Sequence, residues 1–80
     1  MDIKEKIGQR IKDIRSAKAI SQKELAYISD IDRSYIASVE SGKRNISIVN
    51  IEKICKALEI TVKEFFDERI FDNWKSFKWI

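Results

Sequence analysis

Residues 21–45 read SQKELAYISDIDRSYIASVESGKRN, a pattern that predicts two short helices joined by a tight turn and followed by a basic loop. Ser21 can cap the first helix because its hydroxyl accepts a hydrogen bond from a first-turn amide. Glu24, three residues later, completes a capping box. The helix that begins here is expected to turn three apolar side chains inward: Leu25, Ala26 and Ile28.

The turn and the second helix follow directly. Residues 29–32 interrupt the helical period, and Asp30 adopts a left-handed backbone at lower cost than a β-branched residue would. Asp32 is expected to cap a helix over residues 33–41, and Gly42 ends it. Two helices joined in this way form a helix-turn-helix, whose second helix enters the major groove of DNA.

This stretch resembles the helix-turn-helix of the Cro and phage-repressor family of bacterial regulators. The matching positions are Gln22, Ala26, Ile31, Ile36, Glu40 and Gly42. The resemblance extends from about residue 3 to residue 66, and it implies an all-α fold, a compact five-helix lambda-repressor-like DNA-binding domain. More narrowly, GKRNISIVNIEKICKAL followed by FF is similar to restriction–modification controller proteins, which are small homodimers. Asp30 departs from the family, which often has glycine there, and the aromatic tail after Asp67 does not align with the family pattern.

Size and composition agree with a single helical domain. The chain has 80 residues, no proline and two glycines. We expect residues 1–68 to form the helix-turn-helix domain, and residues 69–80 to form an aromatic tail that belongs to the same domain or to the dimer interface. The formal net charge is +3. Residues 1–20 hold six Lys and Arg against three Asp and Glu, and the rest of the chain is balanced. DNA affinity must therefore come from a few well-placed groups rather than from a broad basic face.

Residues 3–18 are expected to form the first helix. Four isoleucines recur at spacings of four, four and three residues, which places them on one face: Ile3, Ile7, Ile11 and Ile14. Gly8 within this helix costs about 1 kcal/mol relative to alanine, which suggests tight packing at that position. The basic side chains are expected on the solvent side, as a solvated face or as phosphate contacts: Lys4, Lys6, Arg10, Lys12 and Lys18.

Arg15 has a more specific expected role. In the family, an arginine at this position pairs with the glutamate that matches Glu40. The resemblance therefore implies an ion pair between Arg15 and Glu40 that ties the first helix to the second helix of the motif and fixes how that helix is presented.

The first turn of the second motif helix is expected to read DNA bases. The candidate base contacts are Arg33, Ser34, Tyr35 and Ser38, which lie opposite the inward-facing Ile36 and Val39. Arg33 could pair bidentately with guanine, the commonest specific contact. Tyr35 could offer its hydroxyl to a phosphate or its ring to a thymine methyl group.

Phosphate contacts are expected on both sides of this helix. Gln22 matches a family glutamine that contacts the DNA backbone, and the amides at the start of its helix favour anions. The basic loop Lys43, Arg44 and Asn45 is expected to lie along the neighbouring backbone, although a solvated turn would look the same. Phosphate contacts position a protein and base contacts specify the sequence.

The C-terminal half is expected to contain two more helices, capped by Ser47 and Thr61. The fourth helix should turn Ile48, Ile51, Ile54, Cys55 and Leu58 inward, and the apolar positions of the fifth are Val62, Phe65, Phe66 and Ile70. By resemblance to the controller proteins, Phe65, Phe66 and Ile70 are expected at a dimer interface. The tail, RIFDNWKSFKWI, holds four of the eight aromatic residues, and its pattern fits either a helix or a strand.

Catalytic and metal-binding patterns are absent. The chain has no histidine and one cysteine, which excludes the usual zinc sites, and no glycine-rich phosphate loop is present. We therefore expect no enzyme activity, no cofactor, no metal and no membrane segment. Cys55 is expected to be a buried hydrophobe in a cytoplasmic protein.

Two functions remain after these exclusions. The first is a sequence-specific transcriptional regulator, a repressor or an activator, that binds double-stranded DNA as a homodimer on a near-palindromic operator. Such a protein could be the controller of a restriction–modification system. The alternative is an antitoxin-like module that binds a protein partner through its aromatic tail.

Overall fold

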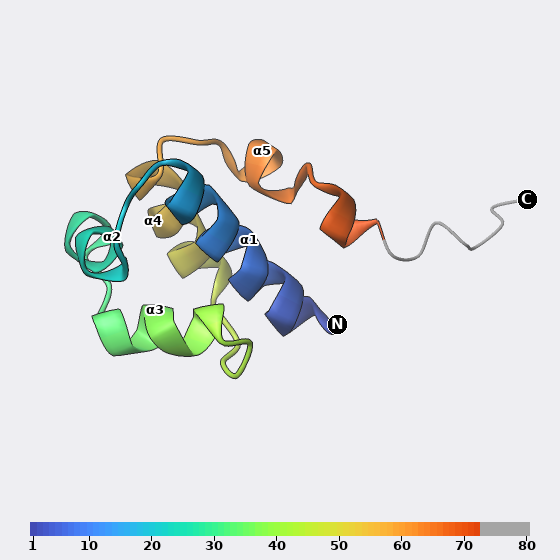
Figure 1. Ribbon diagram of the computed structural model, residues 1–80, viewed down its shortest axis with the longest axis horizontal. Coiled ribbons are helices and arrows are strands. Elements are labelled where there is room, and N and C mark those ends of the chain that lie inside the picture. Colours follow the sequence, from blue (N-terminus) through green and yellow to red (C-terminus); the bar gives the residue numbers. More distant parts are fainter. Residues whose placement is uncertain (73–80) are drawn as a thin grey trace, which may run out of the picture.

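The computed structural model describes residues 1–72, and within that range the chain is all-helical (Figure 1). The helices are α1 (Ile3–Ala17), α2 (Gln22–Ser29), α3 (Arg33–Glu40), α4 (Ile48–Ala57) and α5 (Val62–Phe66), followed by the 3-10 turn η1 (Arg69–Phe71). This confirms the expected five-helix fold, and residues 1–72 contain no strand. Among the described helices, none combines the length and apolarity that a membrane crossing requires.

Each helix begins at the residue that its cap predicts. The hydroxyls of Ser21 and Thr61 accept from the amides three residues later, and the Glu carboxylates at those positions accept in return from the cap amides. Asp2 forms a third such capping box at the start of α1. Asp32 and Ser47 cap α3 and α4 through their side chains. The sequence therefore determines the helix starts locally.

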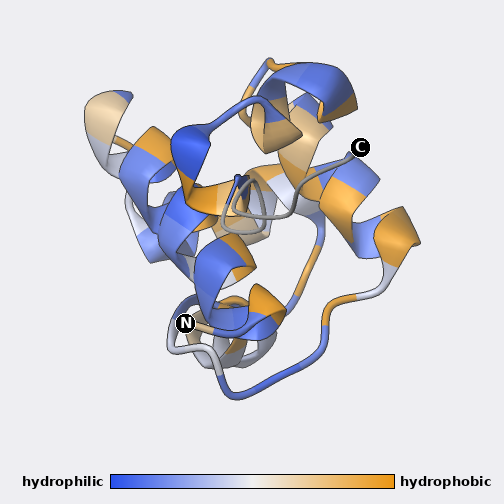
Figure 2. Cartoon of the chain, turned by 90° about the vertical axis from the view of Figure 1, so that its right-hand side faces the viewer, coloured by the Kyte–Doolittle hydropathy of each residue, from blue (hydrophilic) through white to orange (hydrophobic). Residues whose placement is uncertain are grey.

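The core lies where α1, α2, α3, α4 and α5 meet. Its buried side chains are Ile11, Ile14, Leu25, Ile31, Ile36, Val39, Ile51, Ile54, Cys55, Leu58 and Phe65. Figure 2 shows hydrophilic and hydrophobic residues alternating around the helices, as expected of amphipathic helices that each bury one face.

Three isoleucines that were expected to point inward are exposed instead. Ile3, Ile28 and Ile48 retain 56%, 55% and 67% of their surface. Ile3 and Ile48 are the first residues of α1 and α4, and the neighbouring helices leave both side chains largely uncovered. A helical period predicts which side a residue faces, but it does not show where the partner helix ends.

Two basic residues of α1 were wrongly expected in solvent. Lys6 is only 6% exposed, because a lysine side chain can lay its aliphatic stem along apolar surface. Arg10 donates to the backbone oxygens of Phe65 (2.7 Å) and Glu64 (2.8 Å), and its guanidinium lies 3.7 Å from the Glu68 carboxylate. Arg10 therefore joins α1 to the end of α5.

The tight packing suggested for Gly8 is confirmed. A Cβ atom at this position would overlap the carbonyl oxygen of Val39 and lie 2.9 Å from that of Glu40. The backbone of α1 therefore lies directly against the backbone of the last residues of α3. Glycine at residue 8 sets the distance between α1 and α3.

The C-terminal segment is less regular than expected. Helix α5 ends at Phe66, and Ile70 lies in η1 rather than on a continued helix. Phe65, Phe66 and Phe71 form an aromatic cluster with ring centroids 4.9–6.3 Å apart. The first part of the predicted tail thus finishes the core. The helix or strand expected over the rest of the tail, residues 73–80, lies outside the described residues.

Candidate nucleic-acid interface

The turn between α2 and α3 fixes the relation of the two motif helices. Asp30 adopts the left-handed conformation, with φ 57° and ψ 41°, as expected from its side chain. The amide of Ile31 then donates to the carbonyl of Ala26 (3.1 Å), and the Ile31 side chain enters the core. Asp32 accepts from the amide of Ser34 (3.2 Å). The chain thus turns sharply and starts α3 at once.

Helix α3 buries one face and leaves its first turn open. Ile36 and Val39 are 0% and 1% exposed, whereas Arg33 and Ser34 are exposed. Tyr35 and Ser38 are half-buried. No hydrogen bond or ion pair of residues 1–72 uses the guanidinium of Arg33 or the hydroxyl of Ser34. These groups can therefore bind an outside molecule without breaking contacts of the fold.

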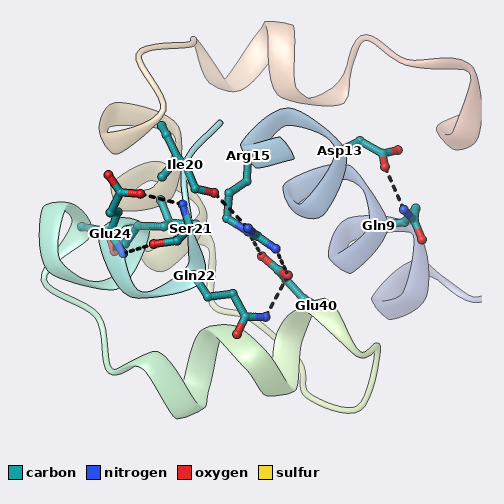
Figure 3. Close-up of polar contacts among 10 residues, drawn as sticks. Gln9, Asp13, Arg15, Ile20, Ser21, Gln22, Glu24 and Glu40 are labelled. Carbon is teal, nitrogen blue, oxygen red and sulfur yellow. Dashed lines mark hydrogen bonds and ion pairs between the residues drawn. The ribbon is translucent and has the colours of Figure 1, made fainter. Parts of the chain in front are cut away.

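Arg15 and Glu40 form a bidentate ion pair that joins α1 to the last residue of α3 (Figure 3). Nε and Nη2 of Arg15 donate to the two carboxylate oxygens at 2.8 and 2.9 Å. The side chains of Arg15 and Glu40 are 14% and 4% exposed. The hydrogen bond to Glu40 raises the pKa of Arg15, and burial opposes it.

The same pair extends to α2 through Gln22. The amide nitrogen of Gln22 donates to Oε1 of Glu40 (3.0 Å), the oxygen that also accepts from Arg15 (Figure 3). Nη1 of Arg15 donates in addition to the carbonyl of Ile20 (2.9 Å), just before α2. The network connects the first three helices. The sequence contains no periodic signal for the contact between Gln22 and Glu40, because eighteen residues separate them.

The basic loop leaves α3 through a left-handed glycine. Gly42 has φ +79°, and its amide donates to the carbonyl of Val39 (3.0 Å). Lys43, Arg44 and Asn45 are all exposed. The loop therefore presents three polar side chains next to the C-terminal end of α3.

Tyr35 and Arg44 also contact each other. The guanidinium carbon of Arg44 lies 4.5 Å from the centroid of the Tyr35 ring, and the Tyr35 hydroxyl accepts weakly from the Ser47 amide (3.4 Å). From the sequence we expected a separate DNA contact for each residue, and no sequence pattern indicated this pairing. Only the folded structure shows that Arg44 and Tyr35 contact each other.

The three residues expected at a dimer interface differ in accessibility. Phe65 is fully buried within its own domain, so its side chain has no surface left for a partner, whereas Phe66 and Ile70 are half-buried. An apolar surface that sequence reasoning missed lies on α4 and α5, where a shallow hollow of about 240 Å³ is lined by Ile48, Val49, Glu52 and Val62. Its three apolar residues are 67%, 60% and 36% exposed.

Residues 1–72 contain no cluster of His, Cys, Asp and Glu that could hold a metal ion. The Cys55 thiol is buried, and burial raises its pKa. A raised pKa leaves less thiolate at neutral pH, and the thiolate is the nucleophile. Cys55 therefore serves as a core residue.

Comparison with known proteins identifies the family to which the chain belongs. The sequence model of the helix-turn-helix family matches residues 11–65. The chain is 46% identical to the control protein C.MunI from Mycoplasma sp over 84% of this chain and 92% of that protein. It is 43% identical to the control protein C.BamHI from Bacillus amyloliquefaciens over 82% and 83% of the two chains.

Solved structures of restriction–modification controller proteins superpose on this chain. The restriction–modification controller protein C.AhdI from Aeromonas hydrophila superposes with a TM-score of 0.76 at 49% identity, covering 79% of this chain and 96% of that one. The controller C.Esp1396I, solved as a tetramer in complex with its natural 35 base-pair operator, superposes with a TM-score of 0.79 at 39% identity. That match covers 84% of this chain and 88% of the controller.

Proposed function

Because the chain belongs to the Cro/C1-type helix-turn-helix family, with restriction–modification controller proteins among its close homologues, we propose that it is a sequence-specific DNA-binding transcriptional regulator. It binds a near-palindromic operator as a homodimer and controls a restriction–modification system. The family consists of DNA-binding regulators, and we assign the protein no catalytic step, cofactor or metal. It acts in the cytoplasm, where the operator lies.

One observation supports this proposal most directly: the outer side of the first turn of α3 is exposed to solvent, while the inner side of the helix is buried in the core. Arg33 and Ser34 are exposed, and Ile36 is fully buried two residues later. A helix held in this way can enter the major groove and present side chains to base edges. Arg33, Ser34, Tyr35 and Ser38 are the proposed base contacts.

The phosphate contacts flank this helix on two sides. Gln22 uses one amide hydrogen on Glu40, and the second hydrogen remains for a phosphate oxygen. Lys43, Arg44 and Asn45 lie on the exposed loop beyond α3 and contact the backbone on the other side. The ion pair of Arg15 with Glu40 contributes by fixing α3 against α1, so that both groups reach the duplex in one orientation.

The homodimer forms through the apolar surface of α4 and α5. Ile48, Val49 and Val62 expose apolar area that one copy leaves uncovered, and Phe66 and Ile70, which come later in the chain, are half-buried. A chain of this size buries only about 60% of its unfolded surface, so covering a further apolar patch adds stability. Phe65 supports this surface from inside the domain.

The test is binding selection from a random duplex pool at fixed moderate salt, followed by sequencing. The expected product is an inverted repeat whose half-sites lie about 34 Å apart, one helical turn. An Arg33→Ala variant should recover the repeat with one relaxed position, whereas Lys12→Ala, on the exposed side of α1, should recover the wild-type sequence. A pool without enrichment would overturn the proposed function.

A further inference from the structure

The contact between Arg44 and Tyr35 joins two parts of the proposed interface. Tyr35 lies in the first turn of α3, and Arg44 lies in the basic loop after α3. The guanidinium carbon stands 4.5 Å from the ring centroid, within the distance of about 6 Å at which a cation over an aromatic face is attracted to the ring.

The other end of the loop also reaches Tyr35. Ser47, the cap of α4, directs its backbone N–H toward the Tyr35 hydroxyl at 3.4 Å. The ring itself packs against the hydrophobic core. Tyr35 is therefore held on one side by the core and contacts the loop at Arg44 and at Ser47.

These contacts limit the freedom of an otherwise exposed arginine. A free arginine side chain loses about 1.5–2 kcal/mol of rotamer entropy when it is ordered. Because Arg44 stacks on Tyr35 in the free protein, part of this entropy is lost when the chain folds and is not lost again when DNA binds. The guanidinium donors lie in the plane of the group, so a stacked arginine can still bind phosphate along its edge.

We propose that Tyr35 is a positioning residue that holds Arg44 in place, so that the base-reading turn and the basic loop engage DNA as one unit. The inference rests on the proposed function and extends it by giving Tyr35 a role that does not require its own contact with a base. The Tyr35 hydroxyl accepts from Ser47 and keeps its own proton, which it can donate to a phosphate oxygen.

The first test uses NMR spectroscopy on the full chain without DNA. Side-chain protons of Arg44 above the Tyr35 ring should show an upfield ring-current shift. Tyr35→Phe should keep the shift because it keeps the ring, and Tyr35→Leu should remove it. Arg44 shifts at random-coil values in the wild-type protein would overturn the proposal, and this measurement needs neither a substitution nor DNA.

The second test is a double-mutant cycle on operator affinity. Tyr35→Leu should weaken binding about two- to fivefold more in the wild-type background than in the Arg44→Ala background, the range expected for an exposed cation–π contact. Tyr35→Phe should preserve the coupling. Lys43→Ala is the matched control, and its loss should add to that of Tyr35→Leu without coupling.

The two tests separate the possible failures. Additive losses for Tyr35→Leu and Arg44→Ala, with operator binding intact, would overturn the positioning role alone. If no operator were selected, the proposed function would fail even if the ring-current shift were present, and Tyr35 would then only order the loop.

Discussion

The carboxylate of Glu40, at the end of α3, accepts two hydrogen bonds from the guanidinium of Arg15 on α1, at 2.8 and 2.9 Å. Both side chains are largely buried. Removal of one partner leaves the other charge buried without compensation, and we expect Arg15→Ala to destabilise the fold by about 3–5 kcal/mol. Urea unfolding measures this change.

The matched control for Arg15→Ala is Asp13→Ala on the same helix. Asp13 accepts from Gln9 at 2.8 Å in an exposed position (Figure 3), and its loss should change stability by less than about 0.5 kcal/mol. Equal effects of the two substitutions would show that the ion pair does not hold α3.

Gly8→Ala should destabilise the protein even though alanine is the better helix former. The helix propensity gain is about 1 kcal/mol, but the new methyl group would overlap the carbonyl oxygens of Val39 and Glu40. Those oxygens belong to the backbone and cannot rotate away, so α1 and α3 must move apart, at a cost of about 1–3 kcal/mol beyond that gain. Thermal unfolding compares this variant with Ser16→Ala, an exposed site on the same helix that should gain stability.

Arg10→Ala should release the end of α5 from α1. The substitution removes the bonds to the carbonyls of Glu64 and Phe65, each worth about 1.5–3 kcal/mol because the donor is charged. Amide hydrogen exchange should rise at residues 65–71 and stay unchanged in α2. Uniform exchange along the chain would instead indicate global destabilisation. Lys12→Ala on the exposed side of α1 is the control.

Arg33→Ala and Lys43→Ala should affect DNA binding in different ways. Arg33→Ala should cost about 1–3 kcal/mol on the operator and relax preference at one base pair. Lys43→Ala should weaken all sequences alike and reduce the salt dependence by about one unit of slope. Fluorescence anisotropy on operator and scrambled duplexes, over a salt series, measures both. An equal loss on both duplexes for Arg33→Ala would contradict its role in base contact.

Acid should weaken the capping boxes of α2 and α5. The pKa of Glu24 and that of Glu64 lie below the ordinary value of 4.5. The largest cause is the hydrogen bond from the backbone amide of Ser21 or Thr61, and the second is the hydrogen bond from the hydroxyl of the same residue. Because the folded-state pKa is depressed, this stabilisation is complete above about pH 4.5 and is lost as the pH falls through the lowered pKa.

The measurement is the thermal midpoint against pH for the wild type and for the Glu24→Gln/Glu64→Gln variant. Glutamine also forms capping boxes and does not titrate. The variant should therefore lose less stability than the wild type on acidification. Parallel curves would show that the two carboxylates do not contribute.

The sequence predicted the local features of the fold because those features depend on neighbours within four residues. Ser21, Asp32, Ser47 and Thr61 cap the helices they were expected to cap. Asp30 adopts the left-handed turn conformation because its side chain tolerates that backbone. The caps and the turn of the segment from α2 to α3 were therefore predicted correctly, although Ile28 of α2 is exposed rather than inward-facing.

The apolar periods were less informative at the ends of the helices. Ile3 and Ile48 follow the inward stripe of their helices, yet both are exposed because no neighbouring helix covers the first turn. Phe65 was expected to face a partner but is fully buried. Hydrophobicity predicts that a residue needs cover and does not say whether its own domain or a second copy provides it.

By itself the sequence determined the five helices, their caps, the turn between α2 and α3 and the polarity of α3. Only the tertiary structure decided that Arg10 reaches the end of α5, that Gln22 shares the carboxylate of Glu40 with Arg15, and that Arg44 stacks on Tyr35. Helix caps and turns form from contacts between residues a few positions apart, so a short stretch of sequence is enough to predict them. Contacts between helices depend on how closely the helix backbones approach each other. Gly8 and the packed core determine this distance, and they do so only once the chain is folded.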